Sequence, residues 1–232
     1  MRCRSKVFIS IITLIFSALN LGLSAQHQIF VSLNSGISLP VGSFAGTSLN
    51  KDSFAKPGVS FGAEAIWFFH SNLGVGVEAN VNNNPLDVTA LTEEKFIADP
   101  FLEELSIRSE SFRTTTISAG IYGKYELSTG FTVHGKLLAG FMRCHTPYQL
   151  YRTQYYLVGP TYYEITSSRN DAFVMIPGLG IQYLFARGIG FKIDGEFQSR
   201  KMSFPFQTSN GLEYSDRTVS YFHIMLSLVI GI

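Results

Sequence analysis

The chain has little cysteine and little charge, and each shortage removes a class of protein. Only two of its 232 residues are cysteines, and charged residues make up 15%. Cys3 falls in a predicted signal peptide, which leaves Cys144 alone in the mature chain and excludes an intramolecular disulfide or a thiolate metal site. With 18 basic and 17 acidic residues, the chain has no broad basic surface for nucleic acid.

Long apolar runs are also missing once the first 25 residues are passed, so no later stretch predicts a transmembrane helix. The N-terminus carries three basic residues before Val7, then an uncharged apolar run to Leu23, then Ser24-Ala25-Gln26. This order is typical of a secretory signal peptide cleaved after Ala25. A single membrane anchor is the alternative, but no basic cluster follows the run. The predicted organisation is a signal peptide at 1–25 and one domain at 26–232.

Catalytic motifs are absent as well. The sequence holds no Gly-x-Ser-x-Gly, no phosphate-binding loop and no His-Glu-x-x-His. We therefore predict no catalytic residue, no cofactor and no metal. One enzymatic alternative stays open, a lipid A-modifying barrel enzyme using His145 with Ser167 or Ser168, although no third orienting group can be assigned to that pair.

What the chain does have is eight stretches in which apolar and polar residues alternate. In one of them, Phe191, Ile193 and Phe197 share a side opposite Lys192, Asp194 and Glu196. Strict alternation over this length predicts half-buried β-strands that can cross a bilayer at a tilt. The predicted fold class is all-β, an eight-stranded antiparallel up-and-down transmembrane β-barrel. The eight predicted strands are 28–39, 57–69, 72–82, 112–127, 131–144, 171–185, 188–200 and 217–232.

The polar sides of these strands are rich in glycine and charge, which suits the inside of a narrow barrel rather than its lipid-facing wall. A soluble lipocalin-like carrier would need the opposite arrangement. Two interpretations of the interior remain open: a paired structural core and a proton or ion path. The predicted interior polar network consists of Glu64, Glu78, Lys124, Glu126, His134, Lys136, Lys192, Asp194, Glu196 and His223.

Connection lengths predict an orientation. The linkers at 70–71, 128–130 and 186–187 are short, and those at 40–56, 83–111, 145–170 and 201–216 are long. Outer-membrane barrels keep short turns in the periplasm and long loops outside. We therefore expect a bacterial outer-membrane location, contact with outer-membrane lipid, and both termini in the periplasm.

Two of the long loops have distinctive compositions. Segment 83–111 is acidic, and its residues 91–105 predict a short helix; it lacks the fixed ligand spacing of a Ca²⁺ loop. In 145–170, the turn signal Val158-Gly159-Pro160 predicts a hairpin in which the fifth and sixth strands continue above the membrane. Its tyrosines suit contact with a protein or sugar, or an interfacial belt. These tyrosines are Tyr148, Tyr151, Tyr155, Tyr156, Tyr162 and Tyr163.

Three features together carry a family resemblance: the Ser24-Ala25-Gln26 signal end, a first strand that runs into Leu39-Pro40-Val41-Gly42-Ser43-Phe44-Ala45, and the glycine-rich hairpin segment 177–183. The chain resembles small outer-membrane barrels of the OmpA/OmpX type, and more closely the PorT-like barrels. It departs from them in ending on Ile232 rather than an aromatic residue. The resemblance implies a non-enzymatic envelope protein with a structural role or an accessory role in protein secretion, and a secretion-machinery partner. The alternative is a surface adhesion or ligand-binding barrel that uses loops 83–111 and 145–170.

Overall fold

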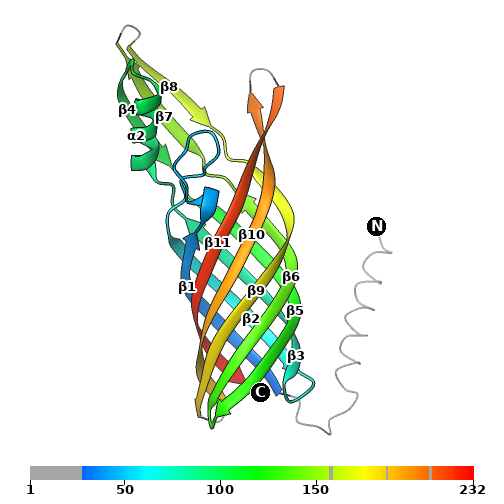
Figure 1. The fold of residues 1–232 in the computed structure, drawn as a ribbon. Coiled ribbons are helices and arrows are strands. Elements are labelled where there is room, and N and C mark those ends of the chain that lie inside the picture. Colours follow the sequence, from blue (N-terminus) through cyan, green and yellow to red (C-terminus); the bar gives the residue numbers. More distant parts are fainter. Residues whose placement is uncertain (1–27, 157–158, 187, 209–210) are drawn as a thin grey trace, which may run out of the picture.

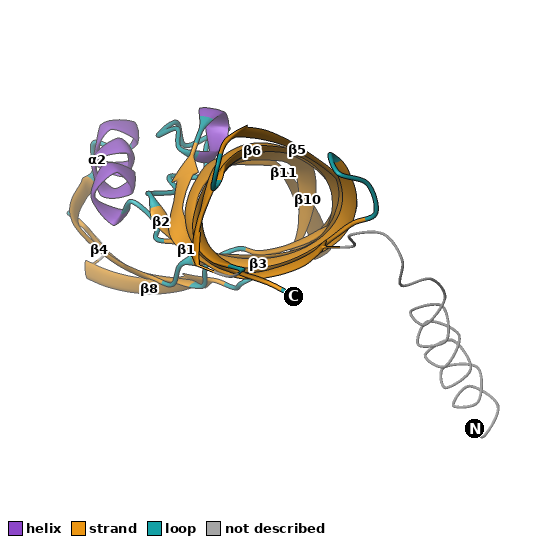
Figure 2. Ribbon diagram, turned by 90° about the horizontal axis from the view of Figure 1, so that it is seen from below, coloured by secondary structure: helices purple, strands orange, loops and turns teal. Residues whose placement is uncertain are grey.

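The computed structural model describes residues 28–156, 159–186, 188–208 and 211–232, which form a closed antiparallel barrel with a smaller sheet at one end (Figure 1). The eight-stranded barrel is confirmed, and seen along its axis it encloses a single ring (Figure 2). The predicted signal peptide lies outside the described residues. Within them, no helix is both long and apolar enough to span a membrane. Around the ring the strands are β1 (Gln28–Pro40), β11 (Gly211–Gly231), β10 (Ile189–Thr208), β9 (Arg169–Ala186), β6 (Phe131–His145), β5 (Phe112–Ser128), β3 (Leu73–Asn84) and β2 (Gly58–Phe68), which pairs with β1.

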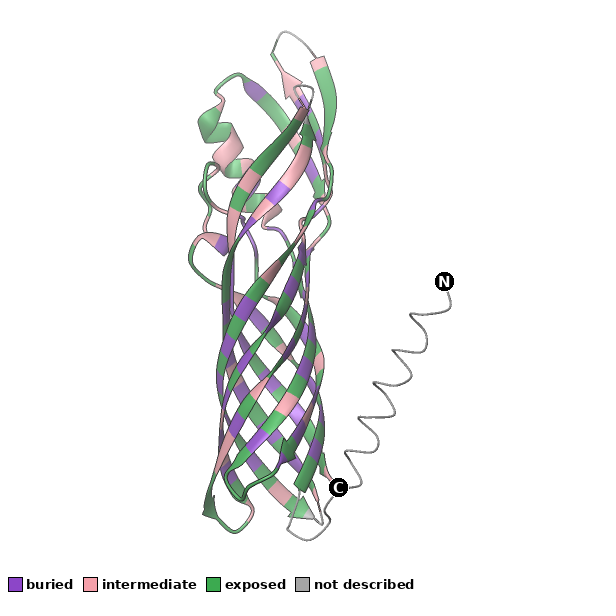
Figure 3. Cartoon of the chain, turned by 90° about the vertical axis from the view of Figure 1, so that its right-hand side faces the viewer, coloured by how far each residue is buried: buried purple, intermediate pink, exposed green. Residues whose placement is uncertain are grey.

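Side chains alternate between the lumen and the outer wall along every barrel strand, so buried and exposed residues follow each other (Figure 3). On β10, Lys192 and Glu196 are buried, whereas Ile193 between them is 58% exposed. Leu179 of β9 is 70% exposed on the outer wall. The wall is therefore apolar, as contact with lipid chains requires, and the charged residues of the strands turn inward.

The two ends of the barrel differ. At one end, named here the turn end, short connections join β2 to β3, β5 to β6 and β9 to β10, and the residues Gln28 and Gly231 lie there too. At the other, named the loop end, the connections from β1 to β2, from β3 to β5 and from β6 to β9 are long, and the β10–β11 hairpin projects beyond the ring (Figure 1). Exposed aromatic residues gather near the turn end, as in the interfacial belts of barrels. They are Trp67, Phe69, Tyr125, Tyr183 and Phe185.

The helix in the acidic loop is shorter and earlier than predicted. Helix α2 spans Val88–Ala98 and strand β4 spans Leu102–Ser109, so the predicted helix over 91–105 is wrong in its second half. The carboxylate of Asp87 accepts a hydrogen bond from the Ala90 amide at 3.1 Å, which fixes the start of the helix. Residues 102–109 become a strand because β7 offers them a backbone partner.

The tyrosine hairpin does form, but the barrel strands do not continue into it. β6 ends at His145, and a separate pair, β7 (Gln149–Tyr155) and β8 (Gly159–Ile165), makes the hairpin. Pro147 lies between β6 and β7, where it cannot donate to a strand ladder. With β4 the hairpin forms a three-stranded sheet ordered β4-β7-β8, named here the loop-end sheet.

The predicted long loop at 201–216 is also wrong, because β10 and β11 stay paired up to Thr208 and Gly211. Alternation continues beyond the predicted strand end: Met202 and Phe204 are buried, whereas Lys201 before them is exposed and Ser203 between them is half-buried. Those two side chains join an apolar cluster that closes the barrel at the loop end.

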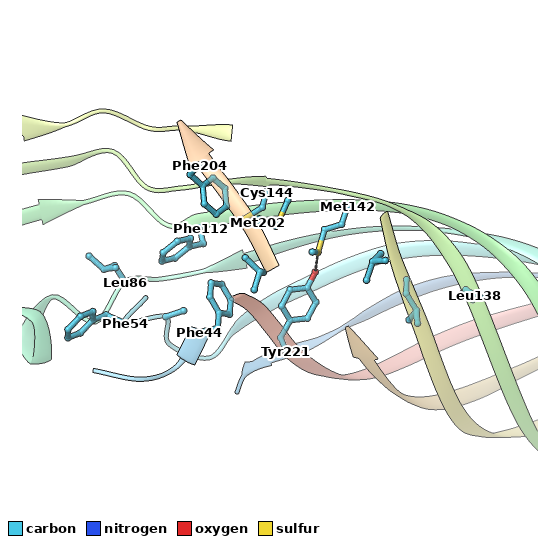
Figure 4. Packing of buried hydrophobic residues seen from close by; sticks show 14 of the residues in the cluster. Phe44, Phe54, Leu86, Phe112, Leu138, Met142, Cys144, Met202, Phe204 and Tyr221 are labelled. Atoms are coloured by element: carbon cyan, nitrogen blue, oxygen red, sulfur yellow. Dashed lines mark hydrogen bonds between the residues drawn. The ribbon is translucent and has the colours of Figure 1, made fainter. Parts of the chain in front are cut away.

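The centre of this cluster is Phe44, carried by the short 3-10 helix η1 (Gly42–Phe44) and fully buried (Figure 4). Its ring centroid lies 5.2 Å from that of Phe112 and 6.3 Å from that of Tyr221. The Tyr221 hydroxyl donates to Gln198 Oε1 at 3.0 Å, just inside the lumen. An apolar layer therefore separates the polar lumen from the loop end.

Candidate functional site

The lumen holds a cluster of ion pairs centred on Lys136 of β6. Its ammonium lies 3.1 Å from Glu64 Oε2, 2.8 Å from Glu78 Oε2 and 2.5 Å from Glu196 Oε1. All four side chains are almost fully buried. Since the carboxylates come from β2, β3 and β10, a single lysine ties together strands on different sides of the ring.

Lys192 is the second cation of the cluster. It contacts Asp194 Oδ2 at 2.9 Å and also pairs with Glu64. The cluster thus sets four carboxylates against two ammonium groups. Buried charges of this kind are stable only when they are paired and hydrogen-bonded.

Neutral donors complete the shell of Glu64. The Tyr122 hydroxyl donates to Glu64 Oε2 at 3.0 Å, and Ser32 Oγ donates to Glu64 Oε1 at 3.3 Å. Tyr122 is a member of the cluster that the sequence analysis missed. Its position was the available signal, because it shares the inward side of β5 with Thr116 and Ser118.

Glycines on β9 make room for the cluster. A Cβ atom on Gly178 would lie 2.9 Å from Lys136 Cε, and one on Gly180 would collide with the carboxylate of Asp194. The glycine-rich strand is therefore required by the long charged side chains that face it.

Six of the ten predicted interior residues form this ion-pair cluster, namely Glu64, Glu78, Lys136, Lys192, Asp194 and Glu196. The other four lie at the edge of the cluster or outside it. His223 Nδ1 is 3.8 Å from Glu196 Oε2, and His134 packs against the ring of Phe68, 6.3 Å between centroids. Lys124 lies at the turn end, where it donates to Gln28 Oε1 at 2.7 Å. Glu126 is exposed and lies outside the cluster.

The part of the chain that the structure describes assembles neither a metal-binding group nor a His–Ser pair. No group of three or more His, Cys, Asp or Glu side chains in the described ranges is placed to hold a metal ion. His145 pairs with Arg169 in the β6–β9 ladder. The hydroxyl of the nearby Ser168 donates to the Pro205 carbonyl at 2.6 Å. The serine is thus engaged elsewhere, and the described residues supply no His145–serine hydrogen bond.

The loop-end sheet has one covered and one open face. Helix α2 lies over the first (Figure 1), where Tyr151 is buried and stacks on Tyr163 with ring centroids 4.5 Å apart. The Lys95 ammonium of α2 sits 4.8 Å above the Tyr151 ring. Tyr151 is therefore a packing residue rather than an exposed contact.

The other tyrosines of the hairpin are more accessible. Tyr156 is 76% exposed and Tyr162 65% exposed. Tyr148 and Tyr155 are partly buried, and the Tyr148 hydroxyl donates to Glu164. Tyr162 points to the open face of the sheet, opposite Arg152 of β7. An exposed aromatic residue beside an arginine is a composition enriched in protein interfaces.

The cap of α2 offers a local test of this end of the molecule. Asp87 also pairs with Lys56 at 3.1 Å, and the Ala90 and Lys56 hydrogen bonds hold the pKa of its carboxyl below the usual value against the opposing effect of burial. Replacing Asp87 by Ala is expected to destabilise α2 by about 1 kcal/mol, seen as faster hydrogen exchange at Ala90. The Asp87→Asn variant retains a capping oxygen, so its Ala90 amide should exchange nearly as slowly as that of the parent protein. Equal exchange in all three proteins would contradict the capping role.

Comparisons with protein-family models and with curated proteins find no match. Among solved structures, the outer membrane protein OprG from Pseudomonas aeruginosa aligns with a TM-score of 0.51 and 10% identity, covering 91% of this chain and 98% of OprG. Neisserial surface protein A aligns with a TM-score of 0.46 and 10% identity, covering 89% and 97%. Ail, the attachment invasion locus protein of Yersinia pestis, gives 0.45 and 13%, covering 89% and 100%. The likeness to OprG shows a shared fold, that of an eight-stranded transmembrane barrel.

Proposed function

We propose that this chain is a non-enzymatic outer-membrane protein that binds a protein partner at the cell surface through its loop-end sheet. In this proposal the turn end and both termini face the periplasm and the loop end faces outward. The outward assignment rests on connection length, since outer-membrane barrels place their long connections outside.

The observation that carries the proposal is the free edge of β8. β8 is the last strand of the loop-end sheet, and within the described residues only β7 pairs with it. Five of its seven residues are exposed. An unpaired strand edge offers backbone donors and acceptors to an extended segment of another protein, and neighbouring side chains select that segment. Tyr162 and Tyr156 are suitably placed for that selection.

The barrel below supports a binding role over a transport role. The ion pairs of Lys136 and Lys192 fill the lumen, and the Phe44 layer closes it at the loop end. Barrels of eight strands have interiors filled by side chains rather than by open water. A partner would therefore bind above the barrel, where the loop-end sheet offers its free strand edge.

A photocrosslinking experiment tests this function. The photoreactive residue p-benzoylphenylalanine replaces Tyr162 in cells that make the protein, and replaces Tyr183 near the turn end as the matched control. We expect one defined protein adduct from position 162 and none from 183. The captured protein, once purified, should bind the lipid-reconstituted barrel about tenfold more weakly after Tyr162→Ala, because an aromatic anchor of an interface is lost.

A deletion supplies the decisive comparison. Removing residues 149–165 and closing the gap with a short Gly-Ser linker should abolish partner binding while the barrel still folds, as judged by its heat-modified gel migration. Retained binding would overturn the proposal. A PorT-like accessory role in secretion predicts another result: deleting the gene traps secreted proteins in the periplasm, and the shortened barrel restores their export.

A further inference from the structure

A hollow lies at the loop end, beside α2 and the covered face of the loop-end sheet. It encloses about 400 Å³, within the size range of small-molecule pockets. Its walls come from the segment after η1, from α2, from the base of the loop-end sheet and from the upper parts of β10 and β11. Four segments distant in the sequence thus converge on one space.

One part of the wall is apolar. Phe54, Leu91 and Phe206 line it, and the first two are buried. Phe54 is the one described non-glycine residue with a positive φ, 53°. A bulky residue held in the left-handed region is strained unless its surroundings fix it. Here the Phe54 carbonyl accepts from the Asp87 amide and its own amide donates to the Gly46 carbonyl, so the loop holds this aromatic wall rigidly.

Two cations also line the hollow, and among the described residues neither has a carboxylate within ion-pair distance. Burial lowers the pKa of Arg217, and the nearby Asp52 carboxylate opposes that effect. Arg217 of β11 donates through Nε to Ser215 Oγ at 3.2 Å and through Nη1 to the Asp52 carbonyl. The Lys95 ammonium approaches the Tyr163 hydroxyl at 3.3 Å and the Tyr151 ring. Burial lowers the pKa of Lys95, so its charge is held at a cost that a bound anion would offset.

The acidic residues of the wall do not neutralise both of these positive charges. The carboxylate of Asp52 accepts the Ser48 amide at 2.9 Å, and Glu213 is exposed near the tip of the β10–β11 hairpin. The partly buried charged groups of the wall are therefore two cations, Lys95 and Arg217, and one carboxylate, Asp52, which leaves a net positive charge.

We propose that this hollow binds a small organic anion, with its apolar body against Phe54, Leu91 and Phe206 and its carboxylate between Lys95 and Arg217. The site is separate from the partner surface of the proposed function, because Tyr156 and Tyr162 do not line it. A failure of either proposal leaves the other standing.

The test uses three probes of one shape and different charge: 2-naphthoate, 2-naphthamide and 2-naphthylmethylamine. Each is titrated at millimolar concentration into the full chain in lipid nanodiscs, with empty nanodiscs as the blank, and methyl resonances of Leu91 and Ile165 are followed by NMR. We expect naphthoate to shift these resonances and to bind about tenfold more tightly than the amide, since a charged acceptor strengthens its hydrogen bonds.

Variants assign the anion site to its residues. Lys95→Gln and Arg217→Gln are each expected to weaken naphthoate binding about tenfold, whereas Arg217→Lys, which keeps the charge, should weaken it less. Arg152→Gln removes one exposed positive charge from the opposite side of the loop-end sheet and should leave the affinity unchanged. Lys95→Gln stays informative if loss of Arg217 disturbs the loop through Asp52.

The proposal is overturned by any of four results. The acid and the amide bind equally, the amine binds most tightly, or neither glutamine variant changes the naphthoate affinity. Absence of any shift at Leu91 and Ile165 at millimolar naphthoate also overturns it.

Discussion

Replacing Lys136 by methionine is expected to lower the free energy of unfolding by about 3–5 kcal/mol, among the largest effects of any single substitution in this chain. Methionine fills a similar volume, so the loss is electrostatic. Glu64, Glu78 and Glu196 would share one remaining cation, Lys192, which contacts only the first of them. Urea unfolding of the protein in lipid vesicles measures the effect.

The matched control for this substitution is Lys201→Met. Lys201 also pairs with an acid, Asp216, at 2.7 Å, but both side chains are half exposed or more. A solvent-screened ion pair of this kind contributes little to the free energy of unfolding. The control variant should therefore unfold at the same urea concentration as the parent protein. If Lys136→Met were as stable as the control, the lumen carboxylates would have to be hydrated, and the ion pairs of Lys136 would not stabilise the barrel.

Replacing Leu226 by arginine is expected to impair insertion, with a loss of about 2–4 kcal/mol if the residue lies near the bilayer midplane. Leu226 is 54% exposed on the outer wall, opposite Ile193 of β10 and Ser35 of β1. The guanidinium would face lipid chains, where it has no partner. Folding into vesicles, followed by heat-modified gel migration, reports the inserted fraction.

The matched control is Leu212→Arg, which makes the same substitution above the membrane-spanning part of β11. Leu212 is on the same strand, is 55% exposed and lies beside the β10–β11 tip, so its arginine variant should insert normally. Normal insertion of Leu226→Arg would mean that this face of β11 does not meet lipid.

Alternation was enough to predict the barrel, because a period of two over a dozen residues fixes both the strand and its faces. What lies above the barrel depends on contacts that no local pattern encodes. Residues 102–109 became a strand only because β7 lies beside them. Residues 201–216 were predicted as a long loop, yet Met202 and Phe204 pack into the apolar cluster.

The sequence predicted which kinds of residue line the lumen, but not which of the inward residues join the ion-pair cluster. Lys136 and Glu196 follow from their inward positions, while Lys124 and Glu126 share that parity and still lie outside the cluster because their part of β5 reaches the turn end. Tyr122 was not predicted as an interior residue, because an aromatic side chain is also common on the outer wall of a barrel. The hollow at the loop end was beyond sequence reasoning, since its cations come from a helix and a strand more than 100 residues apart.

The ion pairs of the lumen also act as a test of strand register. Sliding β10 by one residue would turn Lys192, Asp194 and Glu196 toward lipid and bring Ile193 and Phe197 inside. Lys192 and Glu64 are separated by 128 positions and meet only when the first and last strands close the ring. A misregistered or open cylinder therefore leaves these charges unpaired at membrane depth, and only the correctly closed ring satisfies them.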